Sequence, residues 1–109
     1  MLDTTTFDES KVDWKPLPGP DGKPIDHISL SFLNVDEEAK IVDVLIKISA
    51  NEKILLHRHG SNYSTFTLIG ELRTYFPDGT LKDIRPAGVF KVGEPGEAHT
   101  EGGGDEDVV

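Results

Sequence analysis

A chain of 109 residues is long enough for one domain with its own hydrophobic core. It contains no cysteine, which excludes disulfides and thiolate metal sites, so any metal must take histidine nitrogen and carboxylate or water oxygen. The net charge of −9 argues against nucleic-acid binding. The absence of a signal-peptide pattern or a membrane-length apolar run leads us to expect no membrane contact and a cytoplasmic location.

Residues 1–24 predict an extended N-terminal arm that contains a turn. The segment from Trp14 to Gly22 is rich in proline and glycine. Proline lacks a backbone donor and fixes φ, which excludes a regular helix or a central strand here. We expect Trp14, a large aromatic residue in a polar arm, to pack against the rest of the protein.

Residues 25–109 predict many short strands separated by turns. Strand patterns cover residues 27–33, 41–48, 54–59, 63–69, 71–76, 80–85 and 88–92, and a further strand begins at His99. Turn residues gather at 34–40, 50–52, 60–62, 77–79 and 94–97. No segment shows sustained helical periodicity, so we predict an all-β sandwich or barrel. A last strand near Asp107 would be very short, so either the chain continues past Val109 or a neighbouring subunit covers that edge.

The chain has four histidines, and two of them stand in a His-x-His pair. Residues two apart on a strand share a face, so His57 and His59 would present two imidazoles side by side. His99 offers a third imidazole in another strand pattern. His27 lies apart from these and is interpreted as an ordinary strand or surface residue.

The sequence resembles the cupin superfamily in two motifs. The first cupin motif runs from a glycine through His-x-His and a glutamate to a second glycine, and His57, His59 and Gly70 fit it. The second runs from a glycine through Pro-x-Gly to a histidine. Gly88, Gly96 and His99 fit this one, with the proline displaced by one place to Pro95. The resemblance implies a double-stranded β-helix, or jelly-roll, barrel with a metal held by His57, His59 and His99.

Two positions depart from the cupin pattern. Tyr63 stands where the motif glutamate would be, and the first glycine would fall at Ala50 or Asn51, of which Asn51 can adopt turn geometry. Three neutral imidazoles would leave a divalent ion with its full charge, which favours anionic, bidentate oxygen donors such as an enolate. Small cupins with three histidines include diketone-cleaving and hydroxyacetophenone-cleaving dioxygenases, and cupin domains of anti-sigma factors are similar too.

Other residues are candidates for the surroundings of the metal. Alternation places Tyr63 and Thr65 on the metal-facing side of their strand, and we assign both as candidate catalytic residues outside the set of metal ligands. The alternatives are a tyrosine that closes the mouth of the barrel and a threonine chosen for β propensity. Glu101 shares the face of His99 if the strand continues that far, although the glycines at 102–104 argue for a turn.

Two functions remain open from the sequence. The first is an Fe(II)-dependent dioxygenase that cleaves a small diketone or hydroxyketone chelated to the metal. The second is a non-enzymatic, zinc-bound cupin that senses a metal or a small ligand. Imidazole suits Fe, Zn, Ni and Cu alike, so iron is expected only for the enzyme. We also expect a homodimer.

Overall fold

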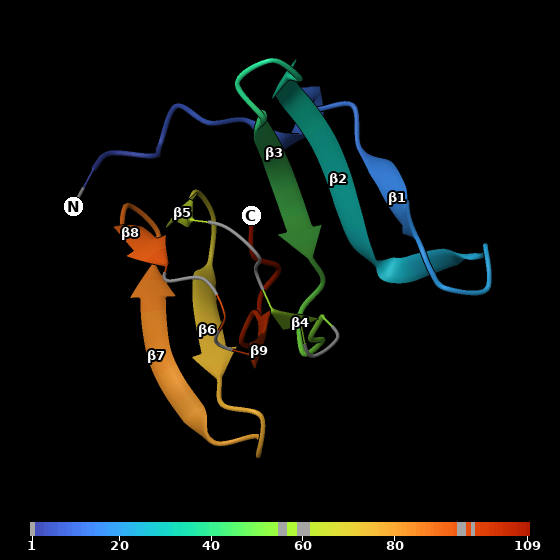
Figure 1. The fold of residues 1–109 in the computed structure, drawn as a ribbon. Helices are drawn as coiled ribbons and strands as arrows, with labels where there is room; N and C mark the ends of the chain where they lie inside the picture. Colours follow the sequence, from blue (N-terminus) through green and yellow to red (C-terminus); the bar gives the residue numbers. More distant parts are fainter. Residues whose placement is uncertain (1, 55–56, 59–61, 94–95, 97) are drawn as a thin grey trace.

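The computed structural model describes residues 2–54, 57–58, 62–93, 96 and 98–109 (Figure 1). Apart from the short 3-10 helix η1 (Glu9–Lys11), the elements in this part of the chain are strands. They are β1 (Lys15–Pro18), β2 (Pro24–Asp36), β3 (Ile41–Ile48), β4 (His57–Arg58), β5 (Tyr63–Phe66), β6 (Glu71–Tyr75), β7 (Leu81–Pro86), β8 (Phe90–Gly93) and β9 (Ala98–Gly102). In these residues, no helix has the length and apolar character needed to cross a membrane.

The strands form three antiparallel sheets. One sheet has the order β1-β2-β3, the second β4-β9-β6-β7, and the third pairs β5 with β8. In Figure 1 the first sheet forms one side of the molecule and β6 and β7 lie on the other, with the C-terminus between them. The prediction of an all-β protein is therefore confirmed.

The first sheet differs from the sequence-based prediction at its ends. β3 has the predicted bounds, whereas β2 extends beyond 27–33 in both directions because residues 24–25 pair with residues 17–18 and residues 34–36 pair with residues 41–43. Part of the predicted arm forms β1, which is an outer strand of its sheet. Pro16 and Pro18 are tolerated there because an outer strand has one edge on which no backbone donor is needed.

Two other strands are shorter than predicted. β5 ends at Phe66 rather than Ile69, and β8 begins at Phe90 rather than Gly88. Beyond Phe66 the backbone finds other partners, since the Thr67 amide donates to the Val89 carbonyl and the Leu68 amide to the Val109 carbonyl. The predicted strand 54–59 is described only in part, as β4.

The C-terminal residues complete an apolar seam, by which we mean Ile28, Ile48, Val108 and Val109. Their exposed fractions are 2%, 3%, 3% and 8%. The Val108 amide and carbonyl bond to those of Ile48 on β3, and the Val109 amide donates to the Ile69 carbonyl. The last strand is thus a single bridge, and it ties the first sheet to the loop between β5 and β6.

The far end of the β2–β3 hairpin exposes apolar side chains. Exposed fractions are 63% for Phe32, 63% for Leu33, 55% for Val35, 51% for Ile41 and 54% for Val42. β3 is also an outer strand of its sheet. The hairpin end therefore presents both apolar surface and backbone edge.

Candidate metal centre

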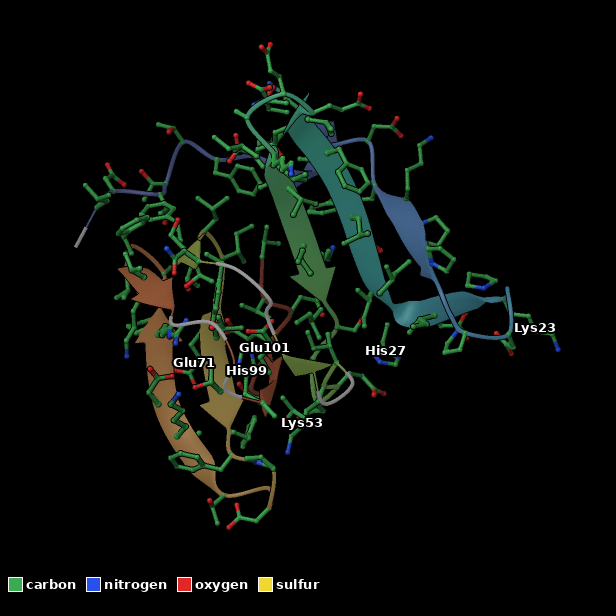
Figure 2. All side chains as sticks on the ribbon, in the orientation of Figure 1. Lys23, His27, Lys53, Glu71, His99 and Glu101 are labelled. Carbon is green, nitrogen blue, oxygen red and sulfur yellow. The ribbon has the colours of Figure 1, made fainter. Side chains whose placement is uncertain are left out.

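Strand β9 places His99 and Glu101 on one face. The strand runs through Glu101 and ends at Gly102, so the predicted turn at the glycines begins after the glutamate. Glycine is required at 102 because a Cβ there would collide with the backbone carbonyl of Glu52. The two side chains are 6% and 13% exposed, and His99 Nε2 lies 3.9 Å from Glu101 Oε2. Figure 2 shows the pair together on β9.

His57 lies opposite His99 in the sheet. The antiparallel pairing of β4 with β9 makes these two residues register partners, with Arg58 opposite Ala98. Directly opposed positions of an antiparallel pair have Cβ atoms ~4.5–5.5 Å apart. The pairing thus brings the backbone of His57 beside that of His99, the third predicted ligand. His59 and the side chain of His57 lie outside what the structure describes.

Within the described residues, no group of three or more histidines and acids is arranged to hold a metal ion. His27, the remaining histidine, has its Nε2 atom 3.2 Å from the Lys53 carbonyl oxygen and lies well away from His99 (Figure 2). The metal site of His57, His59 and His99 therefore stays a prediction. Of these residues, His99 and the backbone of His57 lie opposite each other in adjacent strands.

Tyr63 lies beside His99. Their ring centroids are 6.2 Å apart and the planes are inclined by 40°. Tyr63 is the register partner of Gly93, and its ring occupies the place where a side chain at 93 would stand. The position at which the cupin motif has glutamate is therefore next to His99.

Thr65 belongs to a polar cluster, which we define as Thr65, Thr74, Asp83, Arg85 and Lys91. Arg85 Nη1 donates to Thr65 Oγ1 at 3.0 Å, and Arg85 Nε donates to Asp83 Oδ2 at 3.2 Å. The Thr74 hydroxyl donates to Asp83 Oδ1, and Lys91 Nζ donates to Asp83 Oδ2. Thr74 and Arg85 are 3% and 6% exposed. The cluster therefore joins β5 to the four-stranded sheet through the part-buried Arg85–Thr65 contact, and β8 through the exposed Lys91–Asp83 contact.

Asp83 is held in its charged form. Burial alone would raise the pKa of this carboxyl, but hydrogen bonds from Lys91 and Thr74 and the charge of Arg85 outweigh burial and lower the pKa from 3.8 to about 2. Asp83 is thus a carboxylate at neutral pH. It accepts hydrogen bonds from two cations, so the cluster carries more positive than negative charge.

Thr74 links the cluster to the β9 pair. It is the register partner of Glu101 on one side and of Asp83 on the other. Opposed residues share a face of a sheet. Glu101, Thr74 and Asp83 therefore form a row across β9, β6 and β7, which places the polar cluster beside His99.

Sequence reasoning missed Thr74, Asp83, Arg85 and Lys91. Their neighbours Ile84, Phe90 and Val92 are apolar and alternate with them, so the usual reading turns the apolar residues inward. The structure does the opposite, leaving these three 48%, 58% and 66% exposed. One feature of the sequence could have indicated this cluster. Charged residues alternate with apolar ones on the strands that follow the His-x-His pair.

Comparison with known proteins adds no assignment. No protein-family model matches the chain, and no curated protein matches its sequence.

Proposed function

We propose that this chain is a metal-binding cupin, in which the sheets close into a jelly-roll barrel and His57, His59 and His99 hold one divalent transition metal. The observation that carries the proposal is the pairing of His57 with His99 in adjacent strands. These residues come from two motifs that are separate in the sequence. A metal site requires that such residues meet, and nothing in an unrelated β fold would require it.

The backbone at the motif glycines supports the same proposal. Gly70 and Gly88 have φ values of 74° and 92°, in the left-handed region that favours glycine. Asn51, at one of the two places where the first motif glycine would fall, has φ 61°. Residues chosen by motif spacing alone thus have the conformation for which glycine or asparagine is used.

The donor set fits a transition metal such as iron. Histidine nitrogens with a nearby carboxylate suit Fe, Zn, Ni and Cu, and a bound metal would supply Lewis acidity and, if it is iron, redox chemistry with dioxygen. We propose a dioxygenase acting on a small diketone or hydroxyketone. The side chains of His99 and Glu101 are largely buried. Tyr63 borders the site, and the positive charge of the polar cluster would attract the enolate form of the substrate.

The second candidate is a zinc-bound protein that binds a small ligand without turnover. It is favoured by the contacts of Arg85, whose guanidinium already donates to Asp83 and Thr65. When the charged groups of a site already bind one another, the site suits a ligand that binds unchanged. It suits less well a substrate whose charge changes during a reaction.

Metal analysis of untagged protein tests the proposal. We expect stoichiometric iron or zinc in the purified chain, loss of the metal in His99→Ala, and retention in His27→Ala, the matched control outside the site. Iron with dioxygen uptake on addition of acetylacetone supports the enzyme, whereas zinc without uptake supports the binding protein. Equal metal content in His99→Ala and the parent chain would overturn both.

We also propose that a second copy of this chain covers the end of the β2–β3 hairpin. β3 is an outer strand whose edge can pair with the same edge of a copy about a twofold axis. The exposed residues Phe32, Leu33, Ile41 and Val42 would be buried on association. Light scattering should give twice the mass of the 12.0 kDa chain, and Val42→Lys should give the single mass.

A further inference from the structure

We propose that Glu101 is an oxygen ligand of the metal, supplying from β9 the carboxylate that Tyr63 cannot supply from β5. The proposal rests on the proposed metal-binding function and changes its ligand set from three imidazoles to three imidazoles and a carboxylate. In the sequence, Tyr63 stands at the place of the motif glutamate, and a neutral phenol is a poor metal ligand.

The geometry of the β9 pair allows one ion to touch both residues. His99 Nε2 and Glu101 Oε2 are 3.9 Å apart. With metal–nitrogen and metal–oxygen bonds of ~2.0–2.2 Å, neighbouring ligand atoms on one ion lie ~3.0–3.4 Å apart, so a small rotation of either side chain would bring the two atoms to the separation that a single ion requires. Both side chains are largely buried on the same face of the strand, which is also the face of the row leading to the polar cluster.

Two other carboxylates near this sheet, those of Asp83 and Glu71, bind other side chains. Asp83 accepts hydrogen bonds from Lys91, Thr74 and Arg85, which engage both of its oxygens. Glu71 is ion-paired with Arg73 on the same strand, and alternation puts it on the face opposite Thr74. Of these acids, Glu101 has its carboxylate next to an imidazole nitrogen.

A carboxylate ligand changes what the site can bind. It cancels part of the charge of a divalent ion, so an added anion is attracted less strongly than to a site of three neutral imidazoles. Removing the carboxylate should therefore weaken metal binding and strengthen the binding of an external anion to the metal that remains. A residue with only a structural role would not produce that opposite pair of effects.

Cobalt binding to the full chain tests the assignment. Co(II) affinity is measured by competition with a chelator, and azide affinity and the visible spectrum are measured on Co(II)-loaded protein. Glu101→Gln should lower Co(II) affinity by about 10–100-fold or more, raise azide affinity and alter the visible spectrum. Glu106→Gln removes the same charge from an exposed residue and should leave all three unchanged.

Glu101→Asp keeps the carboxylate and provides the rescue. It should recover most of the Co(II) affinity and the azide affinity of the parent chain. If Glu101→Gln binds Co(II) like the parent, or loses affinity without a change in azide affinity and spectrum, Glu101 is not a ligand. If His99→Ala retains Co(II) as well, the proposed metal site fails instead, so the two failures are distinguished.

Discussion

The apolar seam and the Arg85–Asp83 pair of the polar cluster are both largely removed from water, but one is apolar and the other is charged. In the seam, Ile48, Val108 and their neighbours remove apolar surface from water, and their backbones bond to one another. In the cluster, Arg85 and Asp83 are removed from water together with their charges. Burial of apolar surface stabilises a fold by about 25 cal/mol per Å². Buried charge pairs seldom do better than an apolar replacement.

The seam and the polar cluster are expected to contribute differently to stability and to binding. The seam joins the first sheet to the rest of the molecule and includes the last two residues of the chain. The cluster is next to His99 and Glu101, because Thr74 is the register partner of both Glu101 and Asp83. Changes in the seam should therefore lower the free energy of unfolding most, changes in the cluster should lower it less, and changes of His99 or Glu101 on β9 should alter metal binding if the proposed function holds.

The largest effect on stability is expected from Ile48→Ala. Truncating this buried side chain removes contacts with the seam and leaves a cavity, so the free energy of unfolding should fall by about 2–5 kcal/mol. Urea unfolding measures it. Ile84→Ala, at a position 48% exposed, is the control and should change the value by less than about 0.5 kcal/mol. Equal effects at both positions would contradict the role of the seam in stability.

Asp83→Asn should have an intermediate effect. The change leaves Arg85 and Lys91 without their anion while keeping the shape of the side chain, which should lower the free energy of unfolding by about 1–3 kcal/mol. The contrast to examine is with Glu106→Gln, which also removes one negative charge but from an exposed position. A loss no greater than that of the control would show that the cluster adds nothing to stability.

The contribution of Asp83 should depend on pH. Its pKa is lowered to about 2 in the folded protein, so the carboxylate stabilises the fold above the unfolded value of 3.8. That contribution should fade as the pH drops from 3.8 towards 2. The difference in unfolding free energy between the parent chain and Asp83→Asn should thus be constant near neutrality and shrink across this range. A difference that grew on acidification would contradict the assigned direction.

Sequence alone predicted the all-β fold but not which faces of the strands are buried. Alternation in residues 80–85 shows that Asp83 and Arg85 share a face, while the choice between inside and outside depends on partners such as Thr65 and Lys91 from other strands. The register between strands could not be predicted from the sequence either. Motif spacing named His57 and His99, but their pairing depends on how β4 meets β9. Glu101 was undecided because the following glycines hid where the strand ends.

The smallest effect is expected from Tyr63→Phe. The ring lies 6.2 Å from that of His99, centroid to centroid, and packs over Gly93, so phenylalanine preserves its packing and removes only the hydroxyl. If Glu101 or water supplies the oxygen ligand, metal content after dialysis against a weak chelator should stay close to that of the parent chain. Tyr63→Glu, which adds an anionic oxygen at the motif position, should bind the metal more tightly. Should Tyr63→Phe lose metal as fully as His99→Ala, the phenol is itself a ligand. The phenol would then supply the oxygen ligand that the proposal assigns to the Glu101 carboxylate.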